Sequence, residues 1–208
     1  MKTNKSVHII KIITIAFCSL YMLCSCGTLS RIHLEMTAVD LSCNEKTQVD
    51  SSVVNHLRQT GDNSMYYKDS LISFAWHITY QGLKLKLTNL SDKTLQVLWD
   101  DGSFMGPNGE AGRIIHSGIK YIHTDLQQVP TVVPKGSFIS EFIVPYNDVY
   151  YLNGPNIKYF LITRDDVKHV LNEYFGKPTT VLLPIMIGDE RVEYLFKFVV
   201  SDVKKYYL

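Results

Sequence analysis

Residues 83–99 read Leu-Lys-Leu-Lys-Leu-Thr-Asn-Leu-Ser-Asp-Lys-Thr-Leu-Gln-Val-Leu-Trp, and this stretch carries the clearest structural pattern in the chain. Apolar and polar residues alternate over 83–88 and again over 94–99. A period of two places the apolar side chains on one face, as in a half-buried antiparallel strand. The polar cluster at 89–93 is typical of a turn. With a third apolar run at 70–80, the pattern predicts three neighbouring strands joined by tight turns, a meander.

The rest of the chain continues this rhythm of short strands. Further strands are predicted at 31–41, 113–116, 119–122, 131–133, 138–144, 158–162, 180–187 and 191–200. A short helix is expected near 53–57. A clearer helix is predicted at about 164–175, because Thr163 and Asp166 resemble a capping box and Gly176 follows the last apolar position. Many strands, one late helix and no strand–helix alternation predict a mainly β fold, an antiparallel immunoglobulin-like β-sandwich.

The first 26 residues differ from the rest. Residues 1–11 carry three lysines and no acid, and residues 12–24 are apolar but shorter than the ~20 residues that span a bilayer as a helix. These are the parts of a secretory signal. The run ends in Leu23-Cys24-Ser25-Cys26, which resembles the lipobox of bacterial lipoproteins. That pattern has an aliphatic residue at −3, a small residue at −1 and then the cysteine that is lipidated.

The lipobox resemblance covers residues 1–26 and implies a removed signal peptide at 1–25 and a lipid anchor on Cys26. Each buried methylene contributes about 0.8 kcal/mol, so two or three acyl chains hold a protein on a membrane where one chain does not. Gly27 follows the cysteine in place of Asp, which implies sorting to the outer membrane. Residues 27–32 contain no acid, so the acidic tag for surface export is absent and the periplasmic face is favoured over the cell surface.

The mature chain divides into two predicted parts. Residues 26–65 are expected to form the lipidated cysteine, a tether and an irregular segment, and residues 66–208 the β-sandwich domain. The stretch 83–97 is similar to the strand, Asn-x-Ser turn, strand segment of immunoglobulin-like sandwiches in bacterial envelope lipoproteins. This resemblance implies an antiparallel sandwich, although the Cys–Trp–Cys core of true immunoglobulin domains is absent.

Charge and cysteine content exclude some function classes. The chain has 21 basic and 20 acidic side chains. Residues 1–25 hold three lysines and no acid, which leaves 18 basic against 20 acidic groups, a balance that does not favour nucleic acid. Cys18 and Cys24 leave with the signal and Cys26 is lipidated, so Cys43 remains alone and a disulfide framework is excluded.

Oxygen donors gather in the turn-rich residues 100–112, where Asp100, Asp101, Asn108 and Glu110 follow one another. A hard cation such as Ca²⁺ takes six to eight oxygen ligands, and the spacing differs from that of the D-x-[DN]-x-[DN]-G loop. Local bonding of these side chains to turn backbone is therefore favoured. No metal and no cofactor is predicted.

A second group of polar residues supports an alternative function. His116 and His123 lie seven residues apart, and Ser117 or Ser103 would be the nucleophile of a hydrolase, although neither lies in a G-x-S-x-G elbow. With Asp100 and Asp101, these histidines would serve a membrane-tethered hydrolase or metal-dependent enzyme acting on envelope or glycan substrates. Scattered histidines of strands and loops are the favoured interpretation, and no residue is assigned a catalytic role.

Tyrosines are abundant, and Tyr146, Tyr150 and Tyr151 form one dense group. Exposed aromatic rings offer large contact area at low entropy cost and bind glycans or proteins. Together with Asp100 and Asp101, these tyrosines are the predicted ligand-binding residues. The sequence thus predicts a membrane-anchored envelope lipoprotein with a non-enzymatic binding or structural module, whose partner is an envelope protein or a glycan.

The lipid anchor can be tested directly at the cysteine. Replacing Cys26 with Ala removes the only thiol to which the lipobox pattern assigns the diacylglyceryl group, so the variant should lose both lipid attachment and signal cleavage. Intact-mass spectrometry and membrane fractionation measure the change. Normal processing of Cys26→Ala, or wild-type protein in the cytosol, would contradict the lipoprotein interpretation.

Overall fold

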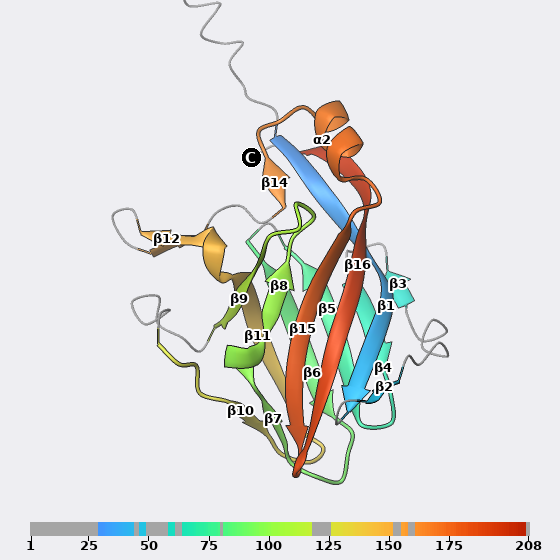
Figure 1. Cartoon of the computed structure of the whole chain (residues 1–208), viewed down its shortest axis with the longest axis vertical. Coiled ribbons are helices and arrows are strands. Elements are labelled where there is room, and N and C mark those ends of the chain that lie inside the picture. Colours follow the sequence, from blue (N-terminus) through green and yellow to red (C-terminus); the bar gives the residue numbers. More distant parts are fainter. Residues whose placement is uncertain are drawn as a thin grey trace, which may run out of the picture.

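The computed structural model describes residues 29–43, 46–48, 58–60, 64–79, 81–117, 126–151, 155–157 and 161–206. These residues form mainly antiparallel β-strands, which confirms the predicted mainly β class (Figure 1). The strands are β1 (Leu29–Cys43), β2 (Lys46–Gln48), β3 (Arg58–Thr60), β4 (Ser64–Lys68), β5 (Ile72–Ile78), β6 (Leu83–Asn89), β7 (Leu95–Val97), β8 (Ser103–Met105), β9 (Ala111–His116), β10 (Thr131–Val133), β11 (Phe138–Pro145), β12 (Val149–Tyr151), β13 (Pro155–Ile157), β14 (Ile162–Thr163), β15 (Pro178–Ile187) and β16 (Glu190–Tyr206).

Most strands belong to one sheet with the order β14-β1-β16-β15-β8-β9-β11-β6-β5-β4-β3, and among the described residues β12 pairs only with β13. The sheet curls into a half-barrel, because side chains at distant places in this order meet in one core. The ring of Phe196 on β16 lies 4.8 Å from Phe74 and 5.0 Å from Trp76, both on β5. Figure 1 shows β5 and β6 behind β15 and β16.

The carboxylate of Asp69 lies at the edge of this aromatic core and binds two of its tyrosines. Asp69 accepts hydrogen bonds from the hydroxyls of Tyr194, at 3.0 Å, and Tyr67, at 3.2 Å. Its other oxygen accepts from the backbone N–H groups of Leu71 and Ile72, both at 2.7 Å. Burial, followed by the nearby Asp69 charge, raises the pKa of Tyr194 far above its usual range, so this phenol stays protonated and donates.

The first strand is longer than the sequence pattern predicts. β1 begins at Leu29 and pairs with β16 from Leu29↔Tyr206 to Cys43↔Val192. The range 26–65 is therefore not only tether and irregular structure, because β1 is part of the same sheet as the rest. A register shift between Met36 and Ala38 changes the alternation, so that Val39 rather than Ala38 is buried.

The predicted meander is wrong at its third strand. β5 and β6 pair as expected, but the second neighbour of β6 is β11, and β7 pairs with β10 and β15. The turn at 89–93 therefore carries the chain from one side of the core to the other. The alternation itself is confirmed, since all three leucines of β6 and both apolar residues of β7 are buried.

A buried asparagine explains why the chain crosses at this turn. The Asn89 side chain is fully buried and donates to the carbonyl oxygens of Lys93, at 2.8 Å, and Val133, at 3.0 Å. Its own oxygen accepts from the N–H and the hydroxyl of Ser91. Since Val133 belongs to β10, Asn89 connects the turn to the strand that pairs with β7. A tight hairpin would leave this amide without those partners.

The late helix is confirmed with a shorter span. α2 covers Val167–Tyr174, and Asp166 is its N-cap, accepting from the N–H of Lys168 at 3.0 Å. Thr163 does not cap the helix, because its hydroxyl donates to Asp165. Gly176 follows the helix with a positive φ of 75°, a conformation that glycine adopts without steric cost. The expected helix near 53–57, the strand at 119–122 and residues 158–160 lie outside the described residues.

The role of Asn89 can be measured as stability. Asn89→Ala should lower the free energy of unfolding by about 2–3 kcal/mol, because the buried Val133 carbonyl loses this donor and the N–H and hydroxyl of Ser91 lose their shared acceptor. Urea denaturation followed by tryptophan fluorescence measures the loss. Asn172→Ala, at an exposed position of α2, is the matched control and should stay within about 0.5 kcal/mol of the wild type. An equal effect of the two substitutions would show that Asn89 does not hold the turn.

Candidate functional site

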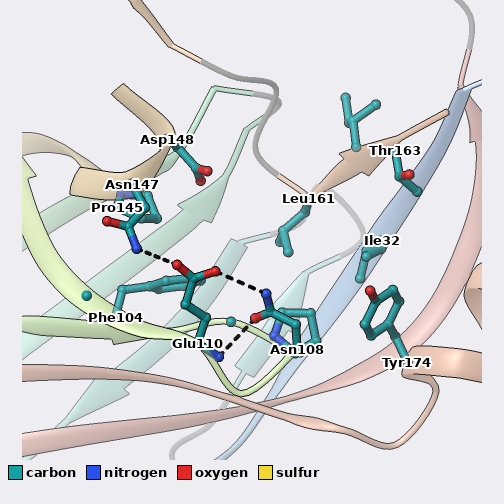
Figure 2. Close-up of a pocket in the computed structure, with 14 residues that line it drawn as sticks. Ile32, Phe104, Asn108, Glu110, Pro145, Asn147, Asp148, Leu161, Thr163 and Tyr174 are labelled. Carbon is teal, nitrogen blue, oxygen red and sulfur yellow. Dashed lines mark hydrogen bonds between the residues drawn. The ribbon is translucent and has the colours of Figure 1, made fainter. Parts of the chain in front are cut away.

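A pocket of about 220 Å³ lies where the β8–β9 turn, the 3-10 helix η4 (Tyr146–Asp148), β14, α2 and the first part of β1 converge (Figure 2). Its buried side chains, such as Ile32, Phe104 and Pro145, are apolar and form its floor, whereas the exposed side chains of Asn108, Glu110 and Asn147 form a polar rim. The lining residues are Ile32, Phe104, Gly106, Pro107, Asn108, Glu110, Gly112, Pro145, Asn147, Asp148, Leu161, Ile162, Thr163 and Tyr174.

The β8–β9 turn has a sequence suited to its sharp reversal. Pro107 follows Gly106, and the N–H of Gly109 donates to the Gly106 carbonyl at 2.9 Å. Pro is favoured at this second turn position. Gly109 has a φ of 81°, the left-handed residue that commonly completes such a hairpin. Asn108 then accepts from the N–H of Glu110 at 3.1 Å, which fixes the amide beside the carboxylate.

Glu110 joins the two polar sides of the pocket. Its Oε1 accepts from Asn147 Nδ2 at 2.7 Å, and its Oε2 lies 3.4 Å from Asn108 Nδ2 (Figure 2). These bonds connect the β8–β9 turn to η4, two segments that lie 37 residues apart in sequence. A carboxylate held by two amides is preorganised, so it presents its remaining acceptor positions without reorientation.

The charge of the lining restricts the ligands that fit. Glu110 and Asp148 are acidic, and no Lys, Arg or His is among the described residues that line this pocket. An anionic ligand would therefore meet carboxylates without a compensating cation. An uncharged group rich in hydroxyls fits better, because hydroxyls donate to carboxylates and exchange hydrogen bonds with amides. The rings of Phe104 and Tyr174 and the side chain of Leu161 add apolar surface.

The predicted ligand-binding residues have separate positions. Asp100 and Asp101 lie in the 3-10 helix η2 (Trp99–Asp101) and form ion pairs with Arg113, at 2.7 Å, and Arg191, at 2.6 Å. Both aspartates lie outside the pocket lining. The Asp101 carboxylate, with Glu193, raises the pKa of the Arg191 guanidinium. The four oxygen donors of residues 100–112 are thus divided, with only Asn108 and Glu110 in the pocket.

The predicted tyrosines are close in sequence to residues that line the pocket, but they are not lining residues themselves. Tyr146 is half-buried in η4, directly before the lining residues Asn147 and Asp148. Tyr150 and Tyr151 belong to β12, whose backbone pairs with β13. The sequence analysis indicated the segment 146–151 as part of a binding site, but it assigned the binding role to the tyrosines and not to the lining residues Asn147 and Asp148. The lining residues from β1, β14 and α2 were missed, since no local motif connects them, whereas the Asn and Glu of the β8–β9 turn were visible as a polar cluster.

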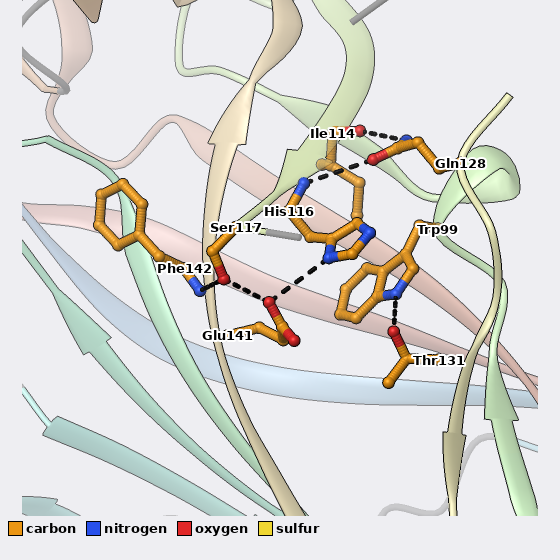
Figure 3. A network of polar contacts seen from close by, with 8 residues as sticks. All are labelled: Trp99, Ile114, His116, Ser117, Gln128, Thr131, Glu141 and Phe142. Atoms are coloured by element: carbon orange, nitrogen blue, oxygen red, sulfur yellow. Dashed lines mark hydrogen bonds and ion pairs between the residues drawn. The ribbon is translucent and has the colours of Figure 1, made fainter. Parts of the chain in front are cut away.

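A second polar cluster surrounds His116 at the end of β9 (Figure 3). Glu141 Oε2 accepts from the Ser117 hydroxyl and lies 3.4 Å from His116 Nδ1. The His116 ring is 7% exposed and stacks on Trp99, with ring centroids 4.6 Å apart. Gln128 donates to the Ile114 carbonyl at 2.9 Å and lies 3.4 Å from the His116 N–H. The Gln128 contacts attach the segment before β10 to β9, and the Glu141 contacts attach β11 to the end of β9.

The order of contacts in the His116 cluster differs from that of a hydrolytic triad. In a triad the histidine lies between the serine and the carboxylate, so that it accepts the serine proton. Here the carboxylate of Glu141 lies between Ser117 and His116. Asp100 reaches this region only through the N–H of Gln128, at 3.1 Å, and His123 is not among the described residues. Within the described ranges no group of three or more His, Cys, Asp or Glu residues could hold a metal ion.

The link between the two sides of the pocket can be tested at Asn147. Asn147→Ala removes the 2.7 Å hydrogen bond to Glu110, so the β8–β9 turn should open more often while global stability falls by only about 1 kcal/mol. Hydrogen exchange of the Gly109 and Glu110 amides measures the opening. Asn172→Ala on α2 is the control. Unchanged exchange in Asn147→Ala would show that this bond does not order the turn.

Comparison with known proteins identifies no family for this chain. The chain matches no family model, no curated protein and no solved structure. Among the described residues, no helix has the length and apolar character needed to cross a membrane. The function is therefore proposed from the resemblance of residues 23–26 to a lipobox and from the chemistry of the pocket around Glu110.

Proposed function

We propose that this chain is a lipid-anchored protein of the bacterial cell envelope whose β domain is a non-enzymatic binding module. The single observation that carries the binding role is the pocket in which Asn108 and Asn147 hold the Glu110 carboxylate between two loops. The support for the anchor is the sequence Leu23-Cys24-Ser25-Cys26 after a short apolar run. Gly27 and the absence of acid up to Ile32 favour the periplasmic face of the outer membrane.

The ligand we propose is a glycan that enters the pocket through one uncharged sugar unit. A sugar has hydroxyls around its edge and C–H groups on its faces. The hydroxyls pair with the carboxylates and amides of the rim, and the C–H faces contact Phe104, Tyr174 and Leu161. The volume of about 220 Å³ is below the ~300–1,000 Å³ of pockets that enclose drug-sized ligands, which favours a single terminal unit.

The alternative is a membrane-tethered hydrolase or metal-dependent enzyme acting on envelope or glycan substrates. Its specific support is the contact of Glu141 with both Ser117 and His116. The order of these contacts and the burial of His116 against Trp99 favour a structural role instead. If His116→Ala keeps the fold and abolishes hydrolysis of an envelope polysaccharide by the purified protein, the enzymatic alternative replaces the binding module.

In finer detail, we propose that the sheet is an immunoglobulin-like sandwich whose two halves remain continuous along one side. Support comes from the face-to-face packing of β5 on β16 and from the passage of the chain between the halves at Asn89. The strong curl of the sheet and the continuous strand order distinguish it from a regular sandwich.

The binding role can be tested with a panel of neutral and anionic oligosaccharides from bacterial envelopes, measured by saturation-transfer NMR on the lipidated protein in detergent. Neutral oligosaccharides should bind, and Glu110→Ala should weaken binding at least about tenfold, because it removes a charge-assisted acceptor. Glu35→Ala, an exposed carboxylate on β1 outside the lining, is the control. Binding by anionic oligosaccharides alone, or equal affinity of Glu110→Ala and wild type, would contradict the proposal.

A further inference from the structure

The distance between the proposed lipid anchor and the first strand is short. Cys26 and Leu29, the first residue of β1, are three positions apart. Three residues span at most about 11 Å when fully extended. If Cys26 carries the lipid, as the proposed function requires, Leu29 is held within that distance of the headgroup region. The tether therefore limits which end of the domain can face the membrane.

Several elements share this end with Leu29. Leu29 pairs with Tyr206 of β16, and Ser30 pairs with Thr163 of β14. The Ser30 hydroxyl also donates to the Asp165 carbonyl at 2.7 Å, just before α2. Figure 1 shows the start of β1, β14 and α2 at one end of the molecule, with the β15–β16 turn at the other. The β1–β16 ladder separates these ends by about 45 Å, at roughly 3.3 Å per residue.

An exposed aromatic residue stands at the anchored end. Phe175, directly after α2, is 62% exposed although the apolar face of the helix packs on the core through Val170. The turn that presents it is fixed, because Gly176 donates to the Val200 carbonyl at 2.9 Å and Val200 donates to the Lys177 carbonyl at 3.1 Å. Phenylalanine, tryptophan and leucine side chains of membrane-bound amphipathic segments insert at the boundary of headgroups and acyl chains, where lysines also extend to the headgroups.

We propose that the end formed by the start of β1, β14 and α2 rests on the phospholipid surface, with Phe175 at headgroup level. The short tether brings this end to the membrane, and the exposed ring gives it an apolar contact there. Lys177 and Lys205 are exposed at the same end and are interspersed with acids such as Asp165 and Asp202. The surface charge is therefore nearly balanced, and the contact does not depend on anionic lipid.

The test uses the full-length lipidated protein in phosphatidylcholine vesicles, with Cys43→Ser as background. Single cysteines at Phe175→Cys and Lys177→Cys report the anchored end. Asp189→Cys, in the exposed turn between β15 and β16, reports the far end. Each carries an environment-sensitive fluorophore, and nitroxide-labelled headgroups serve as quencher. The two sites beside α2 should emit at shorter wavelength and be quenched severalfold more than Asp189→Cys, and added phosphatidylglycerol should change this little.

The outcomes separate the two proposals. If the wild type does not float with the vesicles and Cys26 carries no acyl chains by mass spectrometry, the lipoprotein assignment fails. If the lipidated protein floats but all three labels are equally exposed to water, or Asp189→Cys is the most quenched, the anchor stands and the proposed orientation is overturned. The Lys177→Cys variant keeps the Phe175 ring, so the result does not depend only on a variant that lacks this ring.

Discussion

The pairing of β16 with its two neighbours is the constraint on which the rest of the structure depends. β16 pairs with β1 along nearly its whole length and with β15 over residues 190–199. Its inward residues are buried, and the ring of Phe196 contacts rings from β4 and β5 on the opposite side of the core. One strand therefore sets the register of β1 and β15 and also supplies the surface on which the sheet closes.

Alternation in the sequence predicted which side chains are buried, but not which strands are neighbours. The faces of β5, β6, β7 and β16 follow their patterns because burial on one face is a local property of a strand. Pairing is not local. The same alternation fits a hairpin and a crossing between two sides of a core, and the choice at 89–93 depends on the bond from Asn89 to Val133, 44 residues away. The register shift in β1 between Met36 and Ala38 could not be predicted from the sequence for the same reason.

The two parts of the polar turn at 100–112 have opposite surroundings, and this explains why the site was only partly predictable. Asp100 and Asp101 meet arginines from β9 and β16, which satisfy their charge. Asn108 and Glu110 meet Asn147 instead, so their polar groups border an open pocket. Composition alone could not separate these groups, because the distinction comes from partners that lie from 13 to 90 residues away.

If Cys26 carries a lipid, as we propose, the antiparallel ladder between β1 and β16 has a mechanical consequence. A load that draws the far end of the domain away from the membrane acts along the axis of β1. The hydrogen bonds of the ladder then resist together in shear, instead of separating one after another as they do when a strand is peeled from its end. A load applied at the pocket acts close to the anchor and bypasses most of the sheet. With the proposed anchor and the proposed glycan, tension would thus reach the ligand contact without first unfolding the domain that makes it.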